Sequence, residues 1–244
     1  MLDFFTSFVY NGSMNQYIQK IKEFRTEKGL SQEQVAKAIG VSRPTYSAIE
    51  LGKQELSLDE AKKLATLFGI GLDEFLSGNI PNLAKYKHMI LAFLRTKVSK
   101  DGKIPKTKLA KLLYLADFAW FYNSLESMSG MQYRKIAYGP VPDTFFRALD
   151  ELEADGKIII DRRCDDVGKD MFLIGESESN KNEKIQTISV EEKDLINKIA
   201  TKWKNKKTQE IVNFTHNQLP YSLCRDNELI PYELITQEDP NLVY

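Results

Sequence analysis

Apolar residues recur with helical spacing in short bursts over the first third of the chain. Between residues 15 and 29 they share one face of a helix that a glycine ends. Three further helices each begin at a serine that can cap the first turn, at Ser31, Ser42 and Ser57. The first and third of these serines have Gln or Glu three residues later, which predicts capping boxes. With an apolar turn at residues 72 to 76, the pattern predicts a bundle of short helices.

Residues 77 to 83, "SGNIPNL", have the composition of a linker. Apolar residues with helical spacing resume after it. Residues 108 to 126 are apolar on nearly all sides in their middle turns, so we expect this helix at the centre of a core. Asp117 interrupts it. We expect a buried carboxylate that binds Arg134, Lys135 or backbone amides, with a catalytic role as the alternative.

The stretch "KIAYGPVPDTFFRALDELEADGKI" at residues 135 to 158 places two prolines directly before an amphipathic helix. Pro140 and Pro142 favour an extended chain, and Asp143 is suited to cap the helix. The helix is expected to bury Phe146. The polar run at 175 to 184 is the candidate for disorder, and the six lysines between residues 97 and 111 are expected on the solvated surface.

Two apolar segments, "KIIID" and "DMFLIG", predict a β-hairpin near residues 157 to 174. Helices are expected after it, at residues 189 to 203 and 208 to 214. The fold class is therefore mainly α, with a small hairpin in the second part of the chain.

The 244 residues balance 34 basic with 34 acidic side chains, so no overall field attracts the protein to nucleic acid or membranes. The two cysteines, Cys164 and Cys224, imply no disulfide framework. The apolar start "MLDFFTSFVY" lacks the features of a secretory leader, so we expect a cytoplasmic protein with no membrane contact. Residues 1 to 13 are interpreted as an N-terminal extension, and whether Met1 or Met14 is the native start stays open.

Residues 30 to 76, "LSQEQVAKAIGVSRPTYSAIELGKQELSLDEAKKLATLFGIGLDEFL", resemble the Cro/C1-type (XRE) helix-turn-helix family. The resemblance implies a five-helix lambda-repressor-like DNA-binding domain over residues 14 to 79, with a recognition helix at residues 43 to 51. It also implies DNA contacts by Gln32, Arg43, Thr45, Tyr46, Ser47, Ala48 and Lys53.

Within this set Gln32 is expected to contact a phosphate, Arg43 is suited to read guanine, and the methyl group of Thr45 can meet a thymine methyl. Pro44 stands where the family often has a polar base-reading side chain and offers no hydrogen bond. Residues 14 to 79 hold nine basic and nine acidic side chains, so nonspecific attraction to DNA is weak and a homodimer on operator DNA is expected. A bundle used only for protein contacts is the alternative.

Four segments of the second half resemble the landmarks of the Panacea, or SocA-like, antitoxin domain: "KLAKLLYLADFAWF", "IAYGPVPDTFFRALDELEADGKI", "VNFTHNQLPY" and "ELIPYELI". The resemblance implies a mostly helical α+β domain over residues 80 to 244 that neutralises a toxin by binding it. Gly139 and both prolines are interpreted as structural, and direct toxin contact is considered for Tyr138 and Phe145.

Enzyme motifs are absent from the sequence, which has no glycine-rich phosphate loop, nucleophile elbow or paired-carboxylate motif. His216 and Cys224 together form at most half of a metal site, so no metal or cofactor is expected. The prediction is a non-enzymatic antitoxin of a type II toxin-antitoxin system that also represses its own operon. A ligand-sensing or phage-type repressor, or an adaptor that delivers a toxin to a protease, is the alternative; the partners of the preferred function are operator DNA and a toxin encoded nearby.

Overall fold

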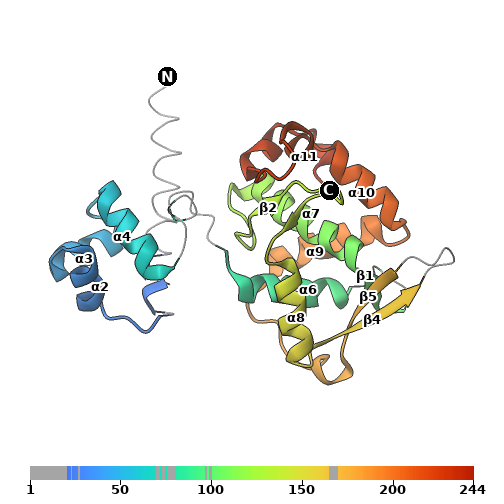
Figure 1. Ribbon diagram of the computed structural model, residues 1–244, viewed down its shortest axis with the longest axis horizontal. Helices are drawn as coiled ribbons and strands as arrows, with labels where there is room; N and C mark the ends of the chain where they lie inside the picture. The colour runs from blue at the N-terminus through green and yellow to red at the C-terminus, as the bar shows by residue number, and fades with distance from the viewer. Residues whose placement is uncertain are drawn as a thin grey trace. The chain divides into compact units, whose positions relative to one another are not determined.

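In the computed structural model the described residues are 21–22, 24–26, 28–69, 72, 75, 81–96, 98, 101–164 and 170–244. The chain splits into two compact units, Met1–Ile80 and Pro81–Tyr244, which are described separately (Figure 1). The predicted extension at residues 1 to 13 and most of the predicted linker lie outside the described residues, so both stay predictions.

The first unit is helical throughout its core. Its helices are α2 (Gln32–Ile39), α3 (Arg43–Glu50) and α4 (Leu58–Phe68), and residues 21–22, 24–26, 72 and 75 are also helical. Apolar residues from each of these segments form one cluster, with Val35, Tyr46 and Leu64 at its centre. The turn between α2 and α3 begins at Gly40, whose φ of 84° favours glycine.

The predicted capping boxes are confirmed. Ser31 Oγ accepts from the backbone N–H of Gln34, and the Gln34 side chain accepts from the backbone N–H of Ser31. Ser57 and Glu60 repeat this arrangement at the start of α4. Local sequence therefore fixes where these helices begin.

The second unit is built around α7 (Lys106–Ser124), most of whose side chains are buried. This confirms the predicted central helix. Figure 1 shows the remaining elements around it, and α6, α9, α10 and η2 all pack against it. The surrounding elements are α6 (Leu83–Leu94), α8 (Phe145–Ala154), η1 (Glu178–Asn180), α9 (Val190–Trp203), α10 (Thr208–Asn217), α11 (Leu219–Leu223), η2 (Tyr232–Gln237) and η3 (Pro240–Leu242).

The predicted hairpin is present as β4 (Ile158–Cys164) and β5 (Asp170–Glu176), paired antiparallel from Ile158 and Glu176 to Cys164 and Asp170. A short strand that the sequence did not predict, β1 (Lys103–Pro105), pairs with the other edge of β5 and gives the order β1-β5-β4. A second small sheet joins β2 (Tyr133–Arg134) to β3 (Val141–Pro142). The mostly helical fold class with a small hairpin is thus confirmed, and no helix in the described part is long and apolar enough to cross a membrane.

Two local predictions for the stretch around α8 are wrong. Phe146 is 49% exposed, whereas Phe145 is buried and forms the apolar face of α8 together with Leu149 and Leu152. Asp143 does not cap the helix, which begins after Thr144 without a side-chain cap. The Asp143 carboxylate instead forms an ion pair with Arg134 at 3.0 Å, because β3 brings the two residues together.

Two predictions drawn from polar composition are also contradicted, the second of them at two of its six lysines. Residues 175 to 184 are described as the end of β5, η1 and a following turn, with Asn180 buried. Arg95 holds this segment through Glu176 and the carbonyl oxygen of Asn180. In the lysine-rich run, Lys108 and Lys111 are buried because they lie on α7, where every face meets a neighbour.

Candidate functional site

The predicted recognition helix, α3, presents its first turn to solvent. Ser42 caps it: its Oγ accepts from the backbone N–H of Thr45 and lies 2.8 Å from the Thr45 hydroxyl. The Thr45 hydroxyl is therefore engaged in the cap, while Arg43 and Pro44 beside it are exposed. An arginine at the start of this helix is free to reach a base edge.

The predicted DNA-binding residues do not all lie on the surface. Arg43 and Lys53 are exposed, and the half-buried members of the set are Gln32, Thr45, Ser47 and Ala48. Tyr46 is completely buried. Its inclusion among the DNA contacts is corrected: it faces inward on α3 and fills the core of the first unit.

A buried carboxylate links the recognition helix to the helix before it. Glu50, at the end of α3, is 7% exposed and accepts from Arg25 Nε at 2.6 Å and from Gln32 Nε2 at 2.8 Å. Arg25 also donates to the carbonyl oxygen of Leu30. Gln32, the expected phosphate contact, is thereby held in place from beneath.

Electrostatics favour the ionised form of this network. Burial opposes ionisation of Glu50, but hydrogen bonds from Arg25 and Gln32 outweigh it and hold the pKa of the carboxyl below its usual value. Burial beside this carboxylate raises the pKa of Tyr46. The sequence carried a signal for Glu50, since it follows Tyr46 by four residues and so falls on the same inward face of α3.

In the second unit, Asp117 is completely buried and accepts three hydrogen bonds. They come from the backbone N–H of Ser129 at 2.7 Å, the Ser129 hydroxyl at 2.5 Å and the Tyr133 hydroxyl at 2.8 Å. Burial raises the pKa of Asp117 to about 6, and these hydrogen bonds limit the rise. The carboxylate therefore fixes the chain after α7 onto the helix.

The expected partners of Asp117 are only partly right. A backbone amide does bind it, as predicted. Arg134 instead pairs with Asp143, and Lys135 donates to the carbonyl oxygen of Cys224 at 2.9 Å. Arg134 is the last residue of β2 and Lys135 follows it, and both side chains contact other segments.

The turn before β3 meets two basic side chains from distant parts of the chain. Gly139 has a φ of 94°, and a Cβ atom built on it would lie 2.7 Å from Lys111 Nζ and 2.8 Å from His216 Nε2. Lys111 Nζ donates to the carbonyl oxygen of Pro140 at 2.8 Å. The "YGPVP" stretch is thus a close approach of backbone to α7 and α10 that glycine alone permits.

Lys111 is only 2% exposed, and burial lowers its pKa to about 7. The His216 ring stacks on Tyr221, with centroids 4.4 Å apart. Its Nε2 atom is buried without a hydrogen-bond partner among the described residues. Burial and the nearby charges of Lys111 and Lys135 lower the pKa of His216.

The two residues considered for toxin contact differ in exposure. Tyr138, directly before Gly139, is 73% exposed. Phe145 is 1% exposed and belongs to the core, so its assignment as a contact is corrected. The exposed ring on α8 is that of its neighbour, Phe146.

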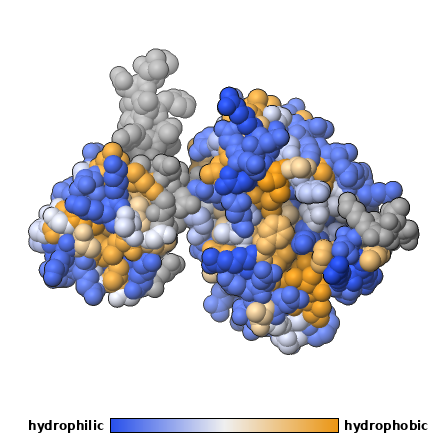
Figure 2. Space-filling model, viewed as in Figure 1, coloured by the Kyte–Doolittle hydropathy of each residue, from blue (hydrophilic) through white to orange (hydrophobic). Residues whose placement is uncertain are grey.

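An apolar strip lies between α8 and the β4–β5 hairpin on the face drawn in Figure 2. Phe146 of α8 is exposed, and Phe172 of β5 is half-buried. Lys106 Nζ lies over both rings, 5.4 Å and 4.1 Å from their centroids. The strip therefore combines aromatic surface with a cation.

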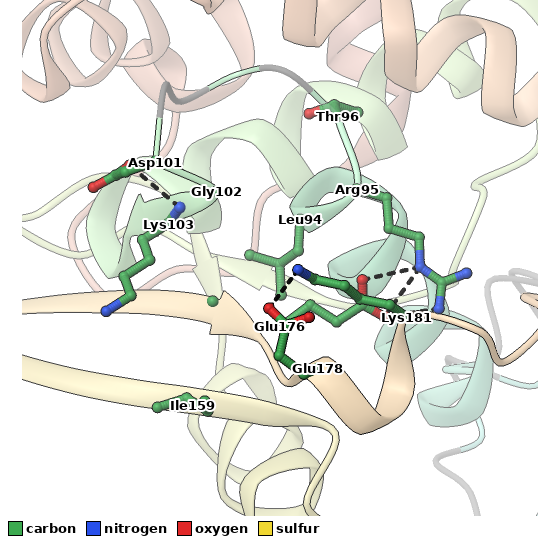
Figure 3. A pocket seen from close by; sticks show the side chains of 11 residues that line it. Leu94, Arg95, Thr96, Asp101, Gly102, Lys103, Ile159, Glu176, Glu178 and Lys181 are labelled. Atoms are coloured by element: carbon green, nitrogen blue, oxygen red, sulfur yellow. Dashed lines mark hydrogen bonds and ion pairs between the residues drawn. The ribbon is translucent and has the colours of Figure 1, made fainter.

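A pocket of about 530 Å³ lies beside the sheet, between the end of α6 and β5 (Figure 3). The charged side chains around it are paired within the protein: Arg95 with Glu176, Lys103 with Asp161, and Lys181 with Glu178. These ion pairs satisfy the charged groups that a ligand would otherwise bind. In the parts of the chain that are described, no three His, Cys, Asp or Glu side chains gather as a metal site would require.

Comparison with known families identifies both units. Residues 21–75 match the helix-turn-helix family, and residues 109–220 match the SocA-like antitoxin family, the Panacea domain. Both are non-enzymatic families. No solved structure gives a significant match.

Curated relatives match the first unit. The cryptic phage CTXphi transcriptional repressor RstR of Vibrio cholerae is 39% identical over 67 residues, which are 28% of this chain and 60% of the relative. The prophage-derived regulator YonR of Bacillus subtilis is 37% identical over 60 residues, 25% of this chain and 56% of the relative. A helix-turn-helix transcriptional regulator of Methanocaldococcus jannaschii is 46% identical over 55 residues, 22% of this chain and 83% of the relative. The chain thus spans less than two thirds of the first two relatives and most of the third.

Proposed function

We propose that this chain, which belongs to the helix-turn-helix transcriptional regulators of the XRE type and carries a SocA-like Panacea domain, is the antitoxin of a type II toxin-antitoxin system. The first unit binds operator DNA and represses the operon, and the second neutralises a toxin encoded nearby by binding it. Neither activity involves catalysis. The observation that carries the proposal is the joining of these two domain families in one chain.

The DNA-binding half is supported by the surface of α3. Arg43 is exposed at its start, and Gln32 is oriented through Glu50. A bidentate contact from arginine to guanine contributes about 1 to 3 kcal/mol of discrimination. Residues 14 to 79 carry equal numbers of acidic and basic side chains, so their nonspecific attraction to DNA phosphates is weak and dimerisation has to compensate. We therefore expect a homodimer on DNA, with half-sites about one helical turn apart.

The toxin-binding half is supported by exposed aromatic surface. Tyr138 stands at the turn before β3, and aromatic side chains are enriched among residues that dominate protein interfaces. The turn is held rigidly by Gly139 and the Pro140 carbonyl against α7. An aromatic side chain has only two side-chain torsions, so it loses little conformational entropy when it is held at an interface.

A phage-type repressor is the second candidate, because RstR and YonR carry phage-related names and match the first unit. In that function the second unit responds to a small ligand. A proteolytic adaptor remains a third function for the same domain. The reading frame beside the gene separates them, since a short toxic gene supports the antitoxin or the adaptor.

Two full-length variants test whether DNA binding and toxin neutralisation are separate activities of the two units. Arg43→Ala is expected to weaken binding to the promoter by about 1 to 3 kcal/mol in a mobility-shift titration while toxin protection of cells is retained. Tyr138→Ala is expected to give the reverse pattern. Lys62→Ala and Val190→Ala, at exposed positions on α4 and α9, serve as controls.

Absence of promoter binding by the wild-type chain would reject autorepression. Failure of the wild-type chain to protect cells from, or co-purify with, the neighbouring product would reject neutralisation and favour the ligand-responsive repressor.

A further inference from the structure

The strand β4 forms an open edge of the three-stranded sheet. The order β1-β5-β4 leaves it paired with β5 on one side only. It is seven residues long, and its last three residues, Arg162, Arg163 and Cys164, are exposed. Figure 1 shows it running away from α8 toward the end of the hairpin. An exposed strand edge presents unpaired backbone N–H and C=O groups, which are the groups that another strand binds.

The register of the hairpin identifies which backbone groups point outward. The carbonyl oxygen of Lys157 accepts from the backbone N–H of Ser177 at 2.9 Å, so these residues form a hydrogen-bonded pair at the start of the ladder. Such pairs alternate with non-hydrogen-bonded pairs along antiparallel strands. The backbone groups of Asp161 are therefore directed at β5, whereas those of Ile160 and Arg162 point away from it. No other segment within the described residues forms a backbone hydrogen bond with Ile160 or Arg162.

One face of the sheet beside this edge carries aromatic side chains. Alternate residues of a strand lie on the same face, so Ile160 and Arg162 share one face of β4. Phe172 lies directly opposite Arg162 on β5 and belongs to that face. Lys106 Nζ lies over the rings of both Phe172 and Phe146, so the aromatic surface continues from the sheet to α8. Apolar side chains of an added strand would extend this surface.

The opposite face beside the edge carries charged side chains. Asp161 and Arg163 of β4 lie on this face, together with Lys103 of β1. The Asp161 carboxylate pairs with Lys103 Nζ and with Arg163 Nη2, each at 2.9 Å. Two cations thus share one carboxylate. An acidic side chain on an added strand would complement them, because opposite charges across neighbouring strands are stabilising.

A second copy of this chain fits the edge poorly. Outward-facing residues must lie opposite each other if two antiparallel β4 strands are to form hydrogen bonds. With Ile160 opposite Arg162 of the other copy, the two Asp161 side chains meet, and with Arg162 opposite itself two arginines meet. With Ile160 opposite itself, Arg163 meets Lys157. Like charges directly opposite are destabilising, so the charges of β4 favour a different chain.

We propose that β4 is a docking edge, at which an extended segment of a partner protein adds a fourth strand to the sheet. The segment has apolar side chains on the face of Phe172 and acidic side chains on the face of Asp161 and Arg163. This assignment rests on the proposed function, in which the segment belongs to the toxin. Backbone hydrogen bonds supply affinity in this mode of binding, and the alternating side chains supply specificity.

Residue-resolved hydrogen exchange tests the added strand directly. The full-length protein is measured by NMR alone and in complex with the co-expressed product of the neighbouring gene. The outward amides of Ile160 and Arg162 are expected to exchange about tenfold or more slowly in the complex. The amide of Asp161, which is directed at β5, is the internal control and should be protected in both states. A complex without this change would overturn the docking edge, and protection that grows with the concentration of the free chain would assign the edge to a second copy instead.

Two substitutions at one position isolate the contribution of the backbone. Arg162→Pro removes the outward N–H without removing a hydrogen bond to β5, whereas Arg162→Ala keeps the N–H; both lose the ion pair with Asp170. The dissociation constant for the neighbouring product is expected to be about tenfold or more higher in Arg162→Pro than in Arg162→Ala. Denaturation followed by tryptophan fluorescence checks the folding of both variants. Equal affinities would contradict the proposal, and the exchange experiment on the wild type decides if the proline variant does not fold.

A synthetic peptide separates failure of the docking edge from failure of the proposed function. The peptide has seven residues, the length of β4, alternates valine with glutamate and is capped at both ends. At millimolar concentration it is expected to shift the amide resonances of Ile160 and Arg162, and a control peptide with lysine in place of glutamate is expected to bind more weakly. If the wild-type protein does not bind the neighbouring product, the proposed function is rejected and the peptide alone decides. Unchanged resonances would then overturn the docking edge, and equal binding of the lysine peptide would overturn its preference for acidic side chains.

Discussion

The first unit and the central helix of the second unit hold buried charges in different ways. In the first unit the buried Glu50 forms an ion pair with the partly buried Arg25, and a neutral amide from Gln32 completes the set. On α7 of the second unit Asp117 and Lys111 are buried apart, and the hydrogen bonds of each are made with neutral groups. An ion pair with its hydrogen bonds made compensates much of its own desolvation, whereas a single buried charge depends on the dipoles around it.

The difference reflects which segments of the chain each buried charge connects. In the first unit Glu50 also accepts from Gln32 and so joins α3 to α2, the two helices that contact DNA in the proposed function. In the second unit three buried charges lie on α7 and bind backbone of irregular segments: Asp117 the amide of Ser129, Lys111 the carbonyl of Pro140, and Lys108 the carbonyls of Trp203 and Lys206. The central helix therefore fixes irregular segments that lack the regular backbone hydrogen bonds of a sheet.

The largest effect is expected for Asp117→Ala, which removes the acceptor of three hydrogen bonds. The amide of Ser129 and the hydroxyl of Tyr133 would stay buried without a partner, and each such group costs about 1 to 3 kcal/mol. We expect the second unit to lose about 4 kcal/mol of unfolding free energy. Denaturation followed by tryptophan fluorescence measures this directly, because both tryptophans lie in this unit. The control is Asp143→Ala at an exposed ion pair, and equal losses in the two variants would contradict the network's role.

Breaking the pair in the first unit is expected to have the next largest effect. Glu50→Ala leaves Arg25 partly buried without its partner and frees Gln32, so we expect a loss of about 3 kcal/mol. Hydrogen exchange in peptides covering α2 to α4 should accelerate, while the tryptophan transition of the second unit stays in place. Promoter binding should fall as well. Glu33→Ala, at an exposed position of α2, is the control, and normal exchange in Glu50→Ala would refute the link between the helices.

The buried Lys111 should give the second unit a pH dependence near neutrality. The folded-state pKa of Lys111 is about 7, below the usual 10.5, so the unfolded chain binds more protons between these values and stability rises with pH. From pH 7 to pH 9 the wild type should gain about 2 kcal/mol relative to Lys111→Met. Parallel unfolding measurements on the two proteins separate this difference from the effect of other groups, including His216. A constant difference would mean that Lys111 keeps its usual pKa.

The lowered pKa of Glu50 gives the first unit a different window. This carboxylate stabilises the folded form above its usual pKa, and the contribution is lost as the pH falls through the lowered value. Acid should therefore destabilise the first unit in a range where Lys111 is already protonated.

The smallest effect concerns a feature that the units share. Ser57 in the first unit and Ser189 in the second both cap a helix through a box completed by Glu60 and Glu192. Ser57→Ala and Ser189→Ala are each expected to cost about 1 kcal/mol, measured by exchange and by fluorescence respectively. A loss several times larger at one of them would show that a contact beyond the helix, such as the ion pair of Lys85 with Glu192, dominates there.

The features that sequence predicted well are local. A capping box needs two residues three apart, and the hairpin needs two apolar runs with a short interval, so both were found. The burial of Phe146 was wrongly predicted because Phe145 and Phe146 both lie three or four residues before Leu149, so helical spacing alone does not distinguish them.

The candidate sites depend on long-range contacts that no local pattern specifies. β1 has three residues and finds its partner strand some seventy residues later. Lys111, Gly139 and His216 meet only in the folded unit. The sequence nevertheless carried a signal for the burial of Lys108 and Lys111, because both lie in the helix that is predicted to be apolar on nearly all sides. A helix of this kind has no solvent-exposed face on which a lysine can lie.

The packing of η2 on α7 has a consequence for the order of events during synthesis. Tyr232 stacks on Phe118, and its hydroxyl donates to the carbonyl oxygen of Met131, so the core around α7 is closed by a segment made about a hundred residues later. Contacts of such wide sequence separation form slowly, whereas the first unit assembles from neighbouring helices. On the ribosome the first unit can fold while the second is still being translated, and the core of the second unit cannot close before residue 232 emerges. A nascent chain would thus form the exposed face of α3 first and complete the core around α7 last.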